Sequence, residues 1–183
     1  MRVRIGRLVA FDGINGAALL VSAHEALVAC QRHLRGGVSR WDASGVFEEL
    51  TMADANAGTP SARTLLLLYA ADLAFRVRWE IRPAVEEGRT VIAAPYVDTA
   101  VAFGRAAGVP STWLSNLFRF APRPVERHLV DAPPSRAKRG RDGFVEVVCE
   151  RWADRTGITH RHLIDAIAGH LIAAHTRHRR RPP

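Results

Sequence analysis

Apolar residues along the chain form short runs that alternate with longer stretches of helical spacing. The run Arg7 to Phe11 ends in four consecutive apolar residues and predicts a buried strand. Thr90 to Ala94 predicts an interior strand, because its β-branched residues suit a parallel sheet. Val38 to Arg40 and His128 to Asp131 are shorter strand candidates. Strands that alternate with helices indicate an α/β fold with a parallel sheet.

Two longer patterns predict helices. Apolar residues recur at helical spacing from Ala17 to Leu34, and the pair Gly36–Gly37 is expected to stop that helix. A long helix is predicted from Pro60 to Gly88, with a bend at Pro83. It is apolar on nearly every face as far as Phe75, so we expect it to be buried centrally or at a subunit interface. The other predicted helices are 46–57, 96–107, 111–120, 144–153 and 160–175.

The pattern fits a single α/β domain over residues 1–176, and 177–183 is predicted to be a basic, disordered tail. No segment approaches the roughly 18 consecutive apolar residues of a membrane span, so no membrane association is expected. The first apolar run is short, lacks a cleavage site and ends in Asp12, which favours a cytoplasmic protein. Cys30 and Cys149 are predicted to be free thiols.

The net charge of +8 raises the question of a nucleic-acid partner. The basic residues are nearly all arginine, with Lys138 as the only lysine, and much of the excess lies in 136–141 and 177–181. Dispersed arginine is more typical of a solvated surface than of a groove for phosphates, so nucleic-acid binding is not expected. The histidines near the C-terminus do not combine with a cysteine or carboxylate into a ligand set, so neither a metal nor a cofactor is predicted.

The stretch FDGINGAALL, Phe11 to Leu20, has the outline of a phosphate-binding loop between a strand and a helix. A P-loop reads G-x-x-x-x-G-K-[ST], where the lysine contacts the phosphates and the hydroxyl binds magnesium. With Gly13 as the first glycine, the second glycine, the lysine and the hydroxyl fall at Ala18, Leu19 and Leu20. The turn is kept, whereas the residues that handle phosphate are replaced.

Five segments in series resemble thymidylate kinase. They are FDGINGAALL, SRWDASG, LLLLYAADLAFRV, PAVEEGRTVIAAPYVDTAVAFG and HLVDAPP. In that family they run as F-[ED]-G-x-[DE]-G-x-G-K-[ST], R-E-P-G, L-x-x-A-A-D-R-A-x-H, P-x-L-x-x-G-x-x-V-[IV]-x-D-R-Y-x-x-S-x-x-A-Y and L-D-x-x-P. The resemblance spans roughly residues 7 to 155. It implies a three-layer P-loop NTPase-like fold, with a short parallel sheet flanked by helices, and a homodimer.

The departures from this family concentrate at positions that handle charge. D-R-Y becomes Ala94-Pro95-Tyr96, the arginine of A-A-D-R becomes Leu73, and R-E-P-G keeps only Arg40, with Trp41 in place of the carboxylate. The lid is reduced to 135–143. Because phosphoryl transfer depends on positioning and on cationic stabilisation of the phosphates, these losses predict a protein without ATP-dependent kinase activity.

The exits of the predicted strands, Asp12 to Gly16, Ala94 to Tyr96 and Asp131 to Pro133, should converge on one cleft. The resemblance matches Asp12 to a loop carboxylate that contacts the sugar, and makes it the candidate catalytic residue. Alternatively, Asp12 ends the strand and caps the loop. The candidate ligand-binding residues are Asn15, Leu19, Arg40, Trp41, Leu73, Phe75, Arg76, Tyr96 and Thr99.

Some of these candidates also have a structural interpretation. Asn15 suits a tight turn, and Trp41 could fill the vacated phosphate site as part of the core. Asp72 lies in a buried helix and is expected to have a structural hydrogen-bond partner.

Two functions follow. In the first, the former nucleotide cleft binds or transforms a small, largely apolar metabolite, with Asp12 as acid, base or anchor and Arg40 orienting an anionic or carbonyl group. In the second, the chain is a non-catalytic pseudokinase that acts as a dimeric interaction module through the helix 61–82. A residual nucleotide-binding protein or kinase is the third alternative.

Overall fold

A computed structural model describes residues 6–53, 58, 60–132, 143–152 and 160–179. Its strands are β1 (Arg7–Gly13), β2 (Arg35–Arg40), β3 (Thr90–Ala94) and β4 (Glu126–Val130). Within the described residues they form one parallel sheet in the order β2-β3-β1-β4. The predicted α/β class and P-loop NTPase-like fold are confirmed.

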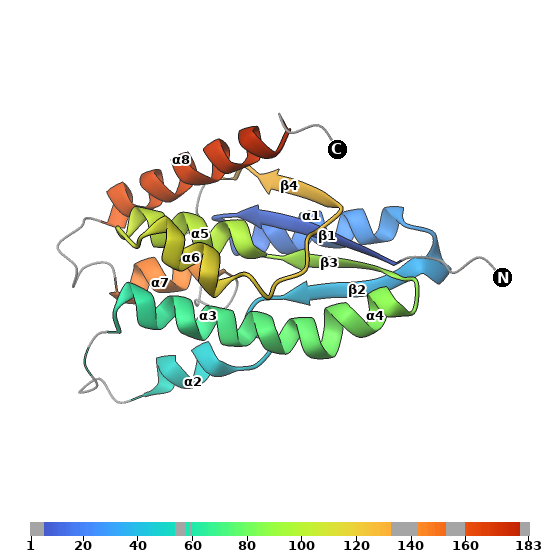
Figure 1. Cartoon of the computed structure of the whole chain (residues 1–183), viewed down its shortest axis with the longest axis horizontal. Coiled ribbons are helices and arrows are strands. Elements are labelled where there is room, and N and C mark those ends of the chain that lie inside the picture. The colour runs from blue at the N-terminus through green and yellow to red at the C-terminus, as the bar shows by residue number, and fades with distance from the viewer. Residues whose placement is uncertain (1–5, 54–57, 59, 133–142, 153–159, 180–183) are drawn as a thin grey trace.

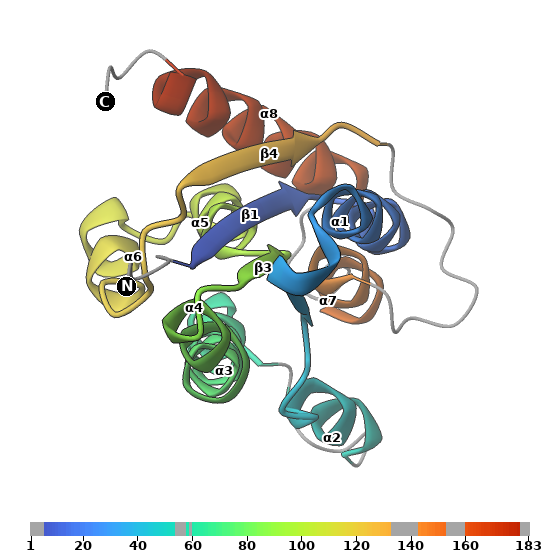
Figure 2. The ribbon, with the colours of Figure 1, turned by 90° about the vertical axis from the view of Figure 1, so that its right-hand side faces the viewer.

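Helices pack on both faces of the sheet (Figures 1 and 2). The α-helices are α1 (Gly16–Ala29), α2 (Val46–Met52), α3 (Ala62–Arg76), α4 (Arg82–Glu86), α5 (Val97–Ala106), α6 (Ser111–Leu117), α7 (Phe144–Trp152) and α8 (His160–Arg179). A short 3₁₀ helix, η1 (Arg32–Leu34), and a π-helical segment, η2 (Val77–Ile81), complete them. Helix α1 covers one face, whereas α3, α4 and α5 cover the other, with α8 beside α5 and β4 (Figure 2).

The central strands are buried on both faces because their side chains alternate between two cores. Leu8 and Ala10 of β1 belong to the large core beneath α3 and α5. Val9 and Phe11 of the same strand point into a smaller core beneath α1, together with Leu19.

The prediction that one helix runs from Ala17 to Leu34 is wrong beyond Ala29. Helix α1 ends there, and residues from Arg35 onward form β2, which pairs with β3. Gly36 does not stop a helix. A Cβ atom on Gly36 would lie 2.9 Å from Cγ2 of Val91, so the glycine permits close approach of the backbone to β3.

The predicted long helix is continuous through α3, η2 and α4. The π-helical segment lies just before Pro83, which has no N–H to donate to the preceding turn. The helix is not buried on every face within the single chain, because Leu67, Phe75 and Trp79 are 53%, 40% and 64% exposed. The helix therefore buries one side against the core and leaves an apolar face on the surface. Burial at a subunit interface, the other alternative, stays a prediction.

Other boundaries differ by a few residues. Helix α8 runs to Arg179, so the segment interpreted as a tail from residue 177 begins as helix. The predicted helices 46–57 and 111–120 end at Met52 and Leu117. Residues 54–57, most of the lid and 180–183 lie outside the described residues. Among the described helices, none has the length and apolarity needed to cross a bilayer.

Candidate functional site

The exits of β1 and β3 meet at Asp12, as predicted. Oδ1 of this carboxylate accepts hydrogen bonds from the backbone N–H of Tyr96 (3.0 Å), the backbone N–H of Thr99 (2.9 Å) and the hydroxyl of Thr99 (2.8 Å). Asp12 therefore acts as a remote cap for the first turn of α5. The side chain is only 4% exposed, so its contacts are structural.

Burial also sets the charge state of Asp12. Loss of solvent and the nearby carboxylate of Asp98 raise the pKa of Asp12 to about 7, although the hydrogen bonds from Thr99 and Tyr96 act in the opposite direction. Asp98 itself is ion-paired with Arg127 (3.1 Å) and lies 3.5 Å from Nε2 of His178. The protonation of Asp12 is thereby coupled to the packing of α5 against β4 and α8.

Three backbone N–H groups at the β1–α1 turn, those of Gly13, Gly16 and Ala18, donate to side chains of the same chain. Gly13 donates to Oγ1 of Thr99 (3.2 Å), and Gly16 donates to Oε2 of Glu146 (3.1 Å). Asn15 is the N-cap of α1, and its Oδ1 accepts from the N–H of Ala18 (2.9 Å). In a P-loop such amides surround the phosphates.

A buried ion pair holds the exits of β2 and β3 to α3. Arg76 donates to the backbone oxygens of Ser39 (3.2 Å) and Pro95 (3.0 and 3.1 Å), and its Nε lies 3.2 Å from Oδ2 of Asp72. Asp72 accepts from the N–H of Asp42 and from Ser44, which fixes the loop after β2. The expected structural partner of Asp72 is confirmed.

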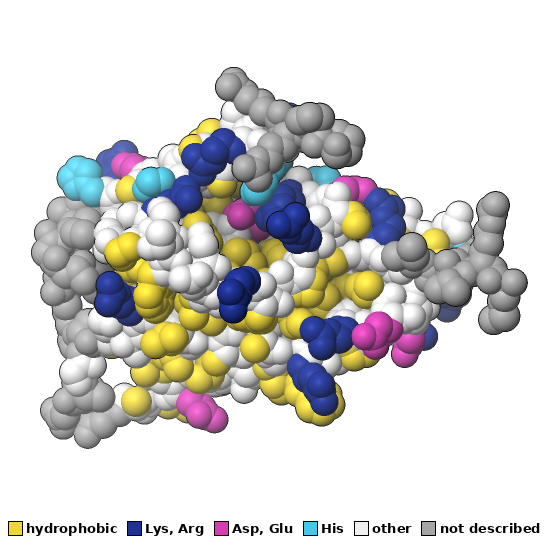
Figure 3. Space-filling model, viewed as in Figure 1, with side chains coloured by type: hydrophobic (Ala, Val, Ile, Leu, Met, Phe, Trp, Pro, Cys, Tyr) yellow, Lys and Arg dark blue, Asp and Glu magenta, His cyan; other side chains and the backbone are white. Residues whose placement is uncertain are grey.

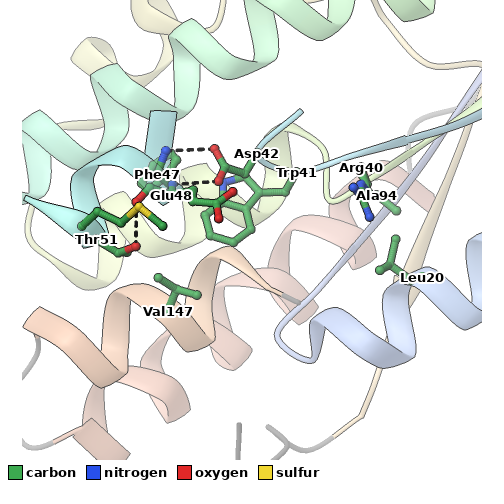
Figure 4. A pocket seen from close by; sticks show the side chains of 10 residues that line it. Leu20, Arg40, Trp41, Asp42, Phe47, Glu48, Thr51, Ala94 and Val147 are labelled. Atoms are coloured by element: carbon green, nitrogen blue, oxygen red, sulfur yellow. Dashed lines mark hydrogen bonds between the residues drawn. The ribbon is translucent and has the colours of Figure 1, made fainter. Parts of the chain in front are cut away.

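A cavity of about 360 Å³ lies beside this carboxyl edge of the sheet. It is lined by Leu20, Arg40, Trp41, Asp42, Phe47, Glu48, Thr51, Met52, Ala94 and Val147. Figure 4 shows the residues of α2 on one wall and Leu20 and Val147, from α1 and α7, on another. The cavity is thus formed where α1, α2 and α7 approach the ends of β2 and β3.

The candidate ligand residues divide between this cavity and the core. Arg40 is exposed and Trp41 buried, and both line the cavity. Leu19, Leu73, Arg76, Tyr96 and Thr99 are buried and do not line it, whereas Phe75 is exposed elsewhere on α3. Asn15 caps α1.

Trp41 both lines the cavity and packs in the core. Its ring packs on Phe47 and Phe144, with ring centroids 5.0 and 6.0 Å away. Its Nε1 is buried and has no hydrogen-bond acceptor among the described residues. A buried donor without an acceptor typically costs about 1–3 kcal/mol, so the indole is a polar group that the fold leaves unsatisfied at the cavity wall.

Sequence reasoning missed most of the cavity wall, namely Asp42, Phe47, Glu48, Thr51, Met52 and Val147. The available signal was that 46–52 directly follows a strand exit, where parallel sheets place their ligands. Asp42 has a left-handed backbone (φ 57°), and its two carboxylate oxygens accept from the N–H groups of Phe47 and Glu48. This cap orients α2 over the cavity.

The comparisons with known proteins agree on one family. A probable thymidylate kinase of Pyrobaculum calidifontis is 31% identical over 130 residues, which cover 70% of this chain and 66% of that protein. Thymidylate kinase of Xanthomonas campestris pv. campestris (strain B100) is 33% identical over 130 residues, covering 70% of this chain and 57% of that protein. The chain belongs to the thymidylate kinase family.

The thymidylate kinase of Ehrlichia chaffeensis has a related structure, with a TM-score of 0.59 and 15% identity, over 69% of this chain and 71% of that one. This likeness supports the fold alone. The chain matches no more than about two thirds of the length of these sequence relatives. No model of a protein family matches it.

Two residues at the start of α1, which the sequence aligns with the lysine and hydroxyl of a P-loop, lie in different surroundings. Leu19, at the lysine position, is 1% exposed and packs with Val9, Phe11 and Ile92 beneath α1. Leu20, at the hydroxyl position, lines the cavity. Among the described residues, no group of three or more histidine, cysteine or acidic side chains could hold a metal ion.

The raised pKa of Asp12 predicts a pH-dependent stability. Between about pH 4 and pH 7 the folded chain retains a proton that the unfolded chain releases. This contribution to stability is fully present below about pH 4 and is lost as the pH rises through about 7. Asp12→Asn keeps an oxygen acceptor but removes the titration. We therefore expect the melting temperature of wild type, relative to that of the variant, to fall between pH 5 and pH 8.

Circular dichroism melts of the two proteins at several pH values measure this difference. Asp131→Asn, at an exposed carboxylate that follows β4, is the matched control and should leave the wild-type pH dependence unchanged. An Asp12→Asn variant whose gap to wild type is the same at pH 5 and pH 8 would show that the carboxyl does not titrate in this range.

Proposed function

We propose that this member of the thymidylate kinase family lacks ATP-dependent phosphoryl transfer and uses its cleft for a small, largely apolar ligand. The observation that carries the proposal is the placement of Leu19. Its side chain is packed in the core where a P-loop would extend a lysine toward the phosphates. An apolar side chain there supplies no charge and makes desolvation of a polyphosphate costly.

The segment after β3 supports the same proposal. In place of D-R-Y, Ala94 lines the cavity, and the carbonyl of Pro95 is engaged by both terminal nitrogens of Arg76. Tyr96 is buried, and its hydroxyl donates to the carbonyl of Pro122 (2.7 Å). Neither an acid for a metal nor a free cation is supplied by these three residues.

The cavity has the size of a small-molecule site. Six of its ten lining residues are apolar: Leu20, Trp41, Phe47, Met52, Ala94 and Val147. Arg40 is the single cationic side chain among them, whereas Asp42 is engaged by the first turn of α2. We infer a ligand with an apolar body and one carboxylate or carbonyl group that Arg40 orients.

The proposal places the protein in the cytoplasm, where thiols stay reduced, and Cys30 and Cys149 are free. It includes no nucleic-acid partner.

Loss of nucleotide binding is tested by thermal shift. ATP with magnesium, and dTMP, each at millimolar concentration, should leave the melting temperature unchanged, because a ligand stabilises only in proportion to its occupancy of the folded state. An active thymidylate kinase measured under the same conditions is the positive control. A saturable rise of several degrees in this chain would contradict the proposal.

The ligand class is tested with small aromatic and branched-chain carboxylic acids, alongside their neutral amides. Binding is read by calorimetry and by tryptophan fluorescence, with Trp41→Phe identifying the signal from the cavity. Arg40→Ala should weaken carboxylate binding about ten- to hundredfold, since a hydrogen bond to a charged group contributes about 1.5–3 kcal/mol. Arg123→Ala, an exposed arginine outside the cavity, should change nothing. Equal affinities of both variants and wild type would rule out this role of Arg40.

The second proposed function is a dimeric interaction module, and the exposed face of α3 and η2 favours it. Leu67, Phe75 and Trp79 lie eight and four residues apart, so they share one side of the helix. Figure 3 shows hydrophobic side chains gathered over this part of the surface. An apolar face of this kind is typical of an interface, and a homodimer buries it on both copies at once.

The double variant Phe75→Glu/Trp79→Glu should convert a wild-type dimer into a monomer, because it places charges at the centre of the shared face. Light scattering coupled to size-exclusion chromatography gives the mass. Val28→Glu, which alters a 63% exposed apolar residue on α1, should stay dimeric. A monomeric wild type at tens of micromolar would exclude the interface.

A further inference from the structure

The contact between Glu146 and the start of α1 is an unusual feature of the β1–α1 turn. Oε2 of Glu146 lies 3.1 Å from the backbone nitrogen of Gly16, although the two residues are 130 positions apart. Glu146 is buried, with only 6% of its surface exposed. A carboxylate removed from water at this place needs a specific favourable partner.

Helix α7 is anchored so that this contact is well defined. Phe144, in its first turn, is buried and packs edge-on against Tyr69, Phe47 and Phe103, with centroid distances of 4.7, 5.7 and 5.3 Å. Two positions later, Glu146 faces α1. The neighbourhood of α1 and α7 is visible in Figure 2.

Gly143 shows independently that the backbone before α7 lies close to the start of α1. A Cβ atom at this position would lie 2.9 Å from both the nitrogen and the Cα of Gly16, and 2.8 Å from Oε2 of Glu146. The backbone before α7 therefore touches the backbone that begins α1. A bound phosphate would need this same space, because it lies against the N–H groups at the start of the helix.

We propose that Glu146 is an internal replacement for phosphate. Its carboxylate takes the anion position at the N-terminus of α1, accepts the N–H of Gly16 and meets the positive end of the helix dipole. Together with Oγ1 of Thr99 on Gly13 and Oδ1 of Asn15 on Ala18, it occupies the turn from within. A phosphate could enter only by displacing a buried carboxylate of the same charge sign.

Glu146 lies at the β1–α1 turn, whereas the proposed ligand would lie in the cavity beside it. The role of Glu146 as the anion at this turn is tested with inorganic anions alone, so it does not depend on whether the cavity binds a small carboxylic acid. A failed ligand screen therefore leaves it intact, and a failed anion experiment leaves the cavity proposal intact.

The test is rescue of a variant by an inorganic anion. Glu146→Ala should lower the melting temperature by several degrees, and tens of millimolar phosphate or sulfate should restore part of that loss relative to chloride at equal ionic strength. The wild type should gain nothing beyond the chloride effect, because its anion position is filled. Glu150→Ala removes an exposed carboxylate from the same helix, and should behave as wild type in both salts.

Two outcomes would overturn the proposal. One is a wild type stabilised by phosphate as much as Glu146→Ala. The other is a folded Glu146→Ala variant that does not respond to phosphate or sulfate, whether or not it has lost stability. If Glu146→Ala folds only in phosphate, the proposal is supported. If it folds in neither salt, Glu146→Gln decides, because this variant keeps an acceptor oxygen but not the charge. A Glu146→Gln protein as stable as wild type and indifferent to phosphate would then refute the role of the carboxylate.

Discussion

The carboxyl edge of the sheet depends on a guanidinium that no solvent reaches. Arg76 is fully buried, and its hydrogen bonds join the end of β2 at Ser39 to the segment after β3 at Pro95. Asp72 neutralises it and at the same time fixes the loop after β2. Removal of one partner from such a pair leaves an unpaired buried charge and typically costs about 3–5 kcal/mol. The ion pair of Arg76 and Asp72 therefore fixes the backbone segments that form the cavity, although neither residue lines it.

Local patterns in the sequence predict the strands and most helices, because the spacing of apolar residues reflects which side of each element packs in the core. Thr90–Ala94 is β-branched and wholly buried, and its prediction as an interior strand is confirmed. The helix prediction is wrong from Cys30 to Leu34, although apolar residues continue at helical spacing there. The residues that follow pair with β3 as strand β2. No local pattern encodes that competition, since it depends on contacts between segments far apart in the chain.

The candidate site was predictable only in part, for the same reason. Arg40 and Trp41, both ligand candidates from the sequence, line the cavity because Arg40 ends β2 and Trp41 directly follows it. Leu73 and Arg76 are also ligand candidates from the sequence, but both are buried and neither lines the cavity. Glu146 gave no signal at all, since its role arises from a contact with Gly16 across most of the chain.

The turn after β1 is held by side chains of the same chain. The N–H groups of Gly13, Gly16 and Ala18 donate to side chains of Thr99, Glu146 and Asn15. Leu19 is buried in the core beneath α1, whereas Leu20 lines the cavity. The carboxyl of Asp12 likewise bonds within the chain, to the first turn of α5.

The π-helical segment Val77–Ile81 has a consequence for comparing this chain with its relatives. A π turn holds about one residue more than an α turn, and each residue of a helix advances the side-chain direction by about 100°. Relatives with an uninterrupted α-helix here would align with a one-residue gap. The wider π turn holds the extra residue within a single turn, so the helix carries an insertion while α4 keeps the same side toward the sheet.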